Sequence, residues 1–132
     1  MCLGFEQYNR EDLMELTIAS RVVSGVVVLD LFGRISHLDQ SLRQTVNALL
    51  QDGHRDFVFN FTEVSYVDSF GLGQLVSIWT SIQNVSGSMR LLRPTSRVMK
   101  LLEITKLDTV FQICSDDETL SQFIESNRAA TA

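Results

Sequence analysis

The sequence predicts a single α/β domain, with a central mixed β-sheet of four to five strands and about four α-helices mainly on one face. Its 132 residues, 45% hydrophobic and 20% charged, suit one globular domain with a sizeable core. Apolar runs of strand length alternate with stretches of helical periodicity, which indicates parallel strands joined by right-handed crossovers. The first two predicted strands are separated only by a turn, so they should form an antiparallel hairpin.

The N-terminal residues 1–13 show no clean periodicity. Two interpretations stay open: a flexible arm, or an over-long start whose natural beginning is Met14. The domain is predicted to span residues 14–126. A disordered tail is predicted over residues 127–132.

The predicted hairpin opens the domain. Residues 15–20 alternate weakly between apolar and polar side chains, and Ser24-Gly25 is a turn signal. Residues 26–32 are β-branched and apolar, which is typical of a strand, and Gly33 ends the run.

A helix and a buried strand should follow. Asp39 is placed to cap a helix that runs to about Gln51, and Gly53 suits the left-handed position after a helix end. The inward stripe of this helix is Leu38, Leu42, Val46, Leu49 and Leu50. Residues 56–61 form a short apolar run that predicts a buried central strand, and residues 66–67 extend it toward the next element.

The next predicted helix follows Asp68 and ends at Gly87. Its inward positions recur at intervals of three and four: Leu72, Leu75, Val76, Trp79, Ile82 and Val85. Residues 89–92 should form a short strand closed by Pro94. Trp79 and Cys114 are interpreted as core residues.

The C-terminal part should add two helices and an edge strand. Thr95 or Ser96 can cap a helix whose inward residues are Val98, Leu101 and Leu102. Residues 110–113 predict the edge strand. Ser115 to Glu118 has the form of a capping box and opens a last helix, with Leu120, Phe123 and Ile124 inward.

Composition narrows the function classes. The formal net charge of −5 and the lack of a basic run argue against nucleic acid, and Arg90, Arg93, Arg97 and Lys100 are interpreted as a solvated face. No apolar run approaches a membrane span, and no signal peptide is visible. The two distant cysteines fit a reduced pair in the cytoplasm. No Cys, Asp or Glu stands at a ligand spacing from His37 or His54, so neither metal nor cofactor is expected.

Residues 67–73, with the sequence VDSFGLG, carry the clearest chemical signal. Asp68 can accept hydrogen bonds from the first turn of a helix, which places Ser69 at the positive end of the helix dipole. Gly71 and Gly73 cost helix stability, so something should approach them closely. A phosphate on Ser69 would make this surface strongly negative and expel a partner that needs a neutral serine. From these residues alone, a plain helix cap is the more common interpretation.

This motif resembles the Asp-Ser-(Ser/Thr/Ala)-Gly-(Leu/Val)-Gly pattern of the STAS family, named for sulfate transporters and anti-sigma-factor antagonists. The resemblance extends from about residue 15 to residue 124, with support from residues 31–35 (LFGRI) and 107–111 (LDTVF). In the antagonist branch, an anti-sigma factor that is itself a serine kinase phosphorylates the serine after the aspartate. That position is Ser69 here. Phe70 departs from the family pattern, in which a second small residue often follows.

The resemblance implies a phosphorylation-controlled switch. The unphosphorylated protein would bind the anti-sigma factor and so release sigma factor, phosphorylation would end that binding, and a PP2C-type phosphatase would restore it. The chain would be a substrate and not an enzyme, a monomer or weak dimer. The expected partner surface comprises Asp68, Ser69, Phe70, Gly71, Asp30 and His37. For Asp30, a polar residue facing solvent is the equally plausible alternative.

Two other functions stay open. The same surface could serve a STAS interaction module in a non-sigma transport or signalling assembly. An enzyme with a serine or aspartate nucleophile is the third, but the sequence offers it no base, metal set or oxyanion signature.

Overall fold

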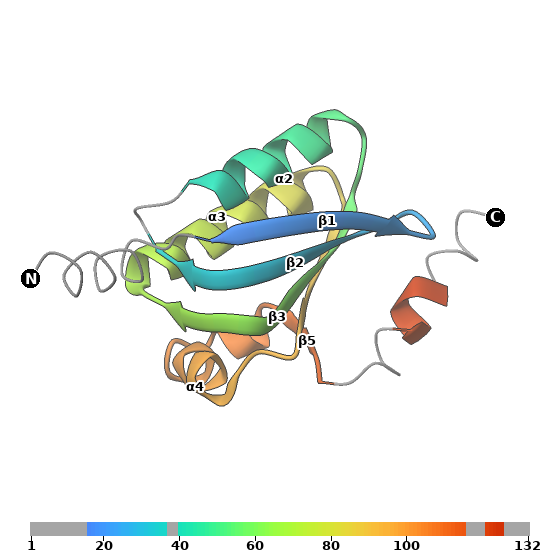
Figure 1. The fold of residues 1–132 in the computed structure, drawn as a ribbon. Coiled ribbons are helices and arrows are strands. Elements are labelled where there is room, and N and C mark those ends of the chain that lie inside the picture. The colour runs from blue at the N-terminus through green and yellow to red at the C-terminus, as the bar shows by residue number, and fades with distance from the viewer. Residues whose placement is uncertain (1–15, 37–39, 116–120, 126–132) are drawn as a thin grey trace, which may run out of the picture.

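The computed structural model describes residues 16–36, 40–115 and 121–125. A five-stranded sheet in the order β1-β2-β3-β4-β5 forms its centre (Figure 1). The strands are β1 (Thr17–Val23), β2 (Val26–Ile35), β3 (Asp56–Val67), β4 (Ser88–Leu92) and β5 (Gln112–Cys114). β1 and β2 pair antiparallel, and the remaining neighbours pair parallel. The predicted mixed sheet and its opening hairpin are confirmed.

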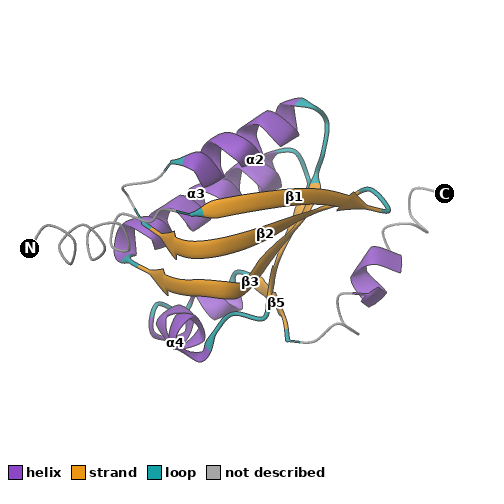
Figure 2. Cartoon of the chain, in the orientation of Figure 1, coloured by secondary structure: helices purple, strands orange, loops and turns teal. Residues whose placement is uncertain are grey.

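Three helices connect the parallel strands (Figure 2). They are α2 (Ser41–Gln51), α3 (Ser69–Asn84) and α4 (Ser96–Ile104), and a single 3₁₀ turn, η1 (Leu107–Thr109), follows α4. All three crossovers advance the sheet in the same direction, so right-handed connections place the helices on one face. Residues 121–125 are also helical and pack on the opposite face. The prediction of about four helices, mainly on one face, is therefore confirmed.

The main core lies between the sheet and its three covering helices. Phe57, Phe59 and Phe61 alternate along β3 and are fully buried there, opposite Leu42 of α2 and Leu75 of α3. A smaller cluster lies on the other face and comprises Val26, Val28, Val58, Leu92 and Cys114, with Phe123 and Ile124 packed against it. Cys114 is thus a core residue, as predicted. Trp79 is partly buried and packs against the main core.

β3 runs six residues beyond its predicted end at Phe61. The register with β2 shifts twice, between the pairs Asp30–Asn60 and Phe32–Glu63 and again before the pair Arg34–Tyr66. Each shift inserts an extra residue in β3, as a β-bulge does. The bulges keep Phe61, Val64 and Val67 on the core face although their spacing is three. The alternation of period two fails at the first bulge, so the strand looked shorter in the sequence.

Several other boundaries differ from prediction. β2 continues through Gly33, whose φ of 119° lets the strand bend and not end. α2 begins at Ser41 after Gln40, whose side chain makes no cap hydrogen bond. Gly53, with φ of 99°, does follow the end of α2 as predicted. Val76 and Val85 are exposed, and the inward position of α3 that the stripe missed is Ile78.

Some predictions fall outside the described residues. They are the arm 1–13, the tail 127–132, Leu38 and Asp39 at the start of the first helix, and most of the capping box before the last helix. Within the described ranges, no helix is long and apolar enough to cross a membrane.

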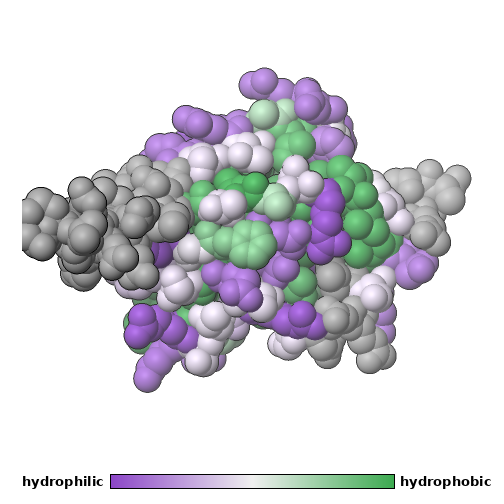
Figure 3. All heavy atoms as spheres, in the orientation of Figure 1, coloured by the Kyte–Doolittle hydropathy of each residue, from purple (hydrophilic) through white to green (hydrophobic). Residues whose placement is uncertain are grey.

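The strand surface turned to the viewer is mixed in character. Hydrophobic and hydrophilic residues lie interleaved over it in the space-filling view (Figure 3). Val22 of β1 and Phe32 of β2 are among the large hydrophobic residues that stay exposed. Among the described residues, Phe123 and Ile124 pack on the smaller cluster of the face opposite the three helices.

Candidate functional site

The start of α3 is fixed by Asp68. This residue has extended backbone angles, φ −96° and ψ −179°, and its Oδ1 accepts a 2.7 Å hydrogen bond from the backbone N–H of Gly71. Its carbonyl accepts the first helical hydrogen bond from the N–H of Leu72, at 2.9 Å. Asp68 is therefore the N-cap that the sequence predicted.

We expect Asp68→Ala to lower the free energy of unfolding by about 0.5–2 kcal/mol, because it removes the acceptor for a backbone N–H of the first turn. Asp68→Asn keeps an oxygen in the same place and is expected to lose little. Urea unfolding of the two variants and the wild type measures the difference. Equal stability of all three proteins would contradict the capping role.

Gly71 lets the helix start lie directly on the end of β2. A Cβ at this position would stand 2.1 Å from the carbonyl oxygen of Ile35 and 2.8 Å from its carbon. The same oxygen accepts a hydrogen bond from the N–H of Asp68, at 3.3 Å. The predicted close approach is thus confirmed for Gly71. It does not hold for Gly73, where nothing in the described part of the chain lies within 4 Å of an added Cβ.

Gln74 also holds the first turns of α3 against the end of β2. Its side chain is buried, and its Nε2 donates to the carbonyl of Ser36, just after β2. This contact was not predicted from the sequence, because a lone glutamine in a helix is ordinarily solvent-exposed. Asp68, Gly71 and Gln74 together tie α3 to the carboxyl end of β2.

Ser69 is exposed at the first position of this fixed helix, and the ring of Phe70 beside it is 63% exposed. The 16 residues of α3, SFGLGQLVSIWTSIQN, contain no Asp, Glu, Lys or Arg. The outward side next to Ser69 is therefore uncharged, and it carries no side chain at Gly73. Phe70 is therefore not buried against the sheet.

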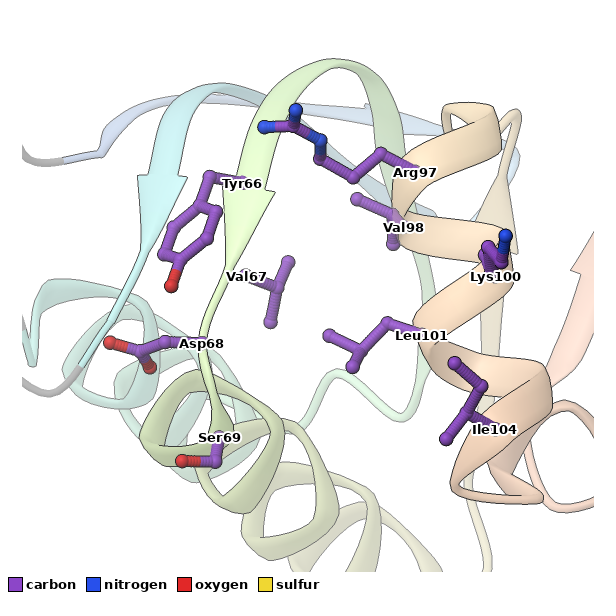
Figure 4. Close-up of a pocket in the computed structure, with 9 residues that line it drawn as sticks. All are labelled: Tyr66, Val67, Asp68, Ser69, Arg97, Val98, Lys100, Leu101 and Ile104. Atoms are coloured by element: carbon purple, nitrogen blue, oxygen red, sulfur yellow. The ribbon is translucent and has the colours of Figure 1, made fainter.

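A groove lies beside Ser69 (Figure 4). Residues 66–69, at the junction of β3 and α3, line one side of the groove, and α4 lines the other side. The α4 residues are Arg97, Val98, Lys100, Leu101 and Ile104. The groove has a volume of about 500 Å³. At one end Arg97 lies near Tyr66, and at the other Ile104 lies across from Ser69.

Asp30 does not belong to this site. It lies in the middle of β2 and pairs in register with Asn60, seven residues before Val67, so it is roughly 20 Å along the strands from the start of α3. Its carboxylate accepts hydrogen bonds from Arg21 (3.0 Å) and Asn60 (2.8 Å). Partial burial opposes ionisation, but these hydrogen bonds outweigh it and lower the pKa of Asp30. His37 lies outside the described residues.

Among the described residues, the side chain of Asn60 makes its hydrogen bonds to β2 and within β3, and not to residues 68–69 at the start of α3. Its Oδ1 accepts from the backbone N–H of Thr62 (3.1 Å) and from the Thr62 hydroxyl (2.6 Å). These contacts span the first β-bulge of β3. Asn60 is therefore a hydrogen-bonded polar residue within a strand.

The predicted solvated face of basic residues is split by the structure. Arg90 stacks over the ring of Phe123, 4.1 Å from its centroid, and donates to Gln112 on the sheet. Arg97 and Lys100 instead line the groove beside Ser69. Arg90 and Arg97, seven residues apart, lie in different places because the end of β4 and a turn come between them. In the described part of the chain, no three His, Cys, Asp or Glu side chains are grouped to hold a metal ion.

Comparisons with known proteins agree with this fold. The family model for the STAS domain matches residues 17–120. A Thermotoga neapolitana protein, provisionally assigned as an anti-sigma factor antagonist, is 30% identical over 109 residues, covering 80% of this chain and 92% of its own. The anti-sigma-B factor antagonist of Staphylococcus aureus is 32% identical over 72 residues, covering 54% of this chain and 67% of its own.

A solved structure agrees as well. The Bacillus cell fate determinant SpoIIAA in its phosphorylated form superimposes with a TM-score of 0.64 at 22% identity, covering 81% of this chain and 99% of its own. This likeness concerns the fold. Together with the family match over most of the chain, it leads to one conclusion: the chain belongs to the STAS domain family, and its relatives include anti-sigma-factor antagonists.

Proposed function

We propose that this chain is an anti-sigma-factor antagonist whose binding to a serine-kinase anti-sigma factor is controlled by phosphorylation of Ser69. The observation that carries the proposal is the setting of Ser69, which is exposed at the first position of a helix fixed by its neighbours Asp68 and Gly71. A kinase can reach such a hydroxyl without unfolding the domain. The names of the relatives supply the regulatory setting.

The proposed switch acts through charge at an interface. A phosphate adds about −1.5 to −2 charges at neutral pH. The N-terminus of α3 tolerates that charge because its dipole is positive there, so the fold need not change. The docking surface does change, because the outward side of α3 next to Ser69 is otherwise uncharged. A partner that buries a neutral Ser69 would have to bury a dianion after phosphorylation, which is strongly unfavourable.

The docking surface we propose comprises Asp68, Ser69 and Phe70. Gly71 contributes indirectly, by positioning the start of α3. Gly71 itself is buried, so its part is to let α3 lie against Ile35. Asp30 is left out because of its distance along the strands. In this cycle the chain is the substrate, a kinase-type anti-sigma factor binds and phosphorylates it in the cytoplasm, and a PP2C-type phosphatase removes the phosphate.

The test is intact-mass spectrometry with site mapping, after incubation with ATP and the serine-kinase anti-sigma factor encoded nearest in the genome. We expect one phosphate, on Ser69, and none on the Ser69→Ala variant. Ser65 and Ser77 flank the site in sequence and serve as internal controls, because both are present in each protein. A phosphate on either of them, or on no residue, would overturn the assignment. A stable complex without phosphorylation would favour the non-sigma STAS module.

A further inference from the structure

We infer that the groove between residues 66–69 and α4 binds a segment of the partner that carries both apolar and acidic side chains. The inference rests on the proposed function, because it names the chemistry of the partner at the same site. The groove is open along its length and has a volume of about 500 Å³, within the usual range for sites that bury a small ligand or a few side chains.

The walls of the groove are apolar. Val67 and Leu101 point toward each other across it, and Val98 lies beside them (Figure 4). Ile104 closes one end and is 70% exposed, more than any other large hydrophobic residue among those described. An apolar side chain so open to water next to an apolar groove is typical of a surface that a partner covers.

The rim that α4 contributes is cationic. Arg97, Lys100, Leu101 and Ile104 follow one another at the spacing of a single helical face. Within the described ranges, neither Arg97 nor Lys100 makes a hydrogen bond or ion pair with another side chain. Arg34 adds a third positive charge near the same end, since its guanidinium lies 4.5 Å from the centroid of the Tyr66 ring.

Acidic residues do not balance these charges in the groove. Asp68 is the acidic residue among the nine that line it, and its Oδ1 already accepts from the N–H of Gly71. The groove thus carries two cationic side chains, Arg97 and Lys100, and one acidic side chain, Asp68, among its lining residues. Charge complementarity therefore favours acidic groups in the occupant.

The position of the groove couples its occupant to Ser69. Ser69 is one of the residues that line the groove, so a phosphate there would stand at the groove wall beside the bound segment, and charges act on one another over a Debye length of ~8 Å at physiological salt. It would repel an acidic segment and attract a basic one. An acidic occupant is consequently the one that phosphorylation expels.

The experiment measures binding of the serine-kinase anti-sigma factor to the full chain by calorimetry, at low and at high salt. Arg97→Glu and Ile104→Asp change the groove. Arg43→Glu on α2 and Val22→Asp on β1 make the same changes at exposed positions away from it. Urea unfolding of each variant verifies that it is folded. Ser69→Asp reports on the proposed switch independently.

We expect each groove variant to bind at least tenfold more weakly than the wild type and both controls. The wild-type affinity should fall with added salt, and the affinity of Arg97→Glu should depend on salt less. Loss of binding in Ser69→Asp with unchanged binding in both groove variants would overturn the inference and leave the proposed function standing. Tighter binding by Arg97→Glu would also overturn it, because the occupant would then be basic. No binding by the folded wild type would overturn the proposed function and the inference with it.

Discussion

Gly71→Ala is expected to destabilise the domain by about 3 kcal/mol, because the added methyl group overpacks a close backbone contact. The new Cβ would lie 2.1 Å from the carbonyl oxygen of Ile35. That oxygen is backbone, and it accepts a hydrogen bond from the N–H of Asp68, so it cannot move aside without disturbing the cap of α3. A loss of this size is a substantial fraction of the 5–15 kcal/mol that typically separates folded from unfolded domains.

The chain offers two matched controls. Gly73→Ala adds the same methyl group to the same helix where nothing lies within 4 Å, so it should stabilise by up to about 1 kcal/mol through helix propensity. Gly87→Ala places a Cβ 2.1 Å from the carbonyl oxygen of Arg55, far from Ser69, and should destabilise as Gly71→Ala does. Urea unfolding compares all three. If Gly71→Ala were as stable as Gly73→Ala, the packing of α3 on β2 would be wrong.

Ser69→Asp is expected to weaken binding to the anti-sigma factor by about a hundredfold, or ~2.7 kcal/mol. The substitution puts a fixed negative charge at the centre of the proposed docking surface, where burial of an unpaired charge is costly. Ser69→Ala should bind like the unphosphorylated protein. Titration calorimetry with the purified partner measures all three affinities.

Charge and size are separated by Ser69→Asn, which has nearly the shape of the aspartate and no charge. We expect it to bind far better than Ser69→Asp, and equal weakening by both would contradict an electrostatic switch.

The stability of Ser69→Asp distinguishes unfolding of the domain from loss of binding by the folded domain. An aspartate in the first turn of a helix is favourable by about 0.3–1 kcal/mol, so Ser69→Asp should be at least as stable as the wild type.

The local part of the site could be predicted because local chemistry determines it. Asp68 is followed three residues later by the N–H that it binds, so the sequence alone places both groups. The same holds for the cap of α4, where the hydroxyl of Thr95 accepts from the N–H of Val98 at 3.3 Å. The sequence left Thr95 and Ser96 as alternatives, and the structure selects Thr95.

The non-local part could not be predicted in the same way. The groove joins Tyr66 and Ser69 to α4 residues about thirty positions later, and in the sequence Arg97 and Lys100 look like an ordinary solvated face. Gln74 was missed because its acceptor, the carbonyl of Ser36, lies on another element. Asp30 was expected on the surface because the prediction noted its strand and not its position along that strand. Counting residues to the carboxyl end of β2 would have placed it roughly 20 Å from the start of α3.

The absence of charged residues from α3 has a consequence for how clearly the proposed signal can be read. A partner that recognises charge responds to the change in charge of the surface it binds. On a helix with many ionised side chains, one more charge would change the total charge only slightly. On α3 the phosphate would be the first formal charge, and beside the single carboxylate of Asp68 it would take the charge of the proposed docking surface from about −1 to about −2.5 to −3. The contrast would survive physiological salt, because a buried interface excludes most of the ions that screen exposed charges. A lysine or arginine introduced on the outward side of α3 would add charge to this surface. It would make the phosphorylated and unphosphorylated forms harder for a partner to distinguish.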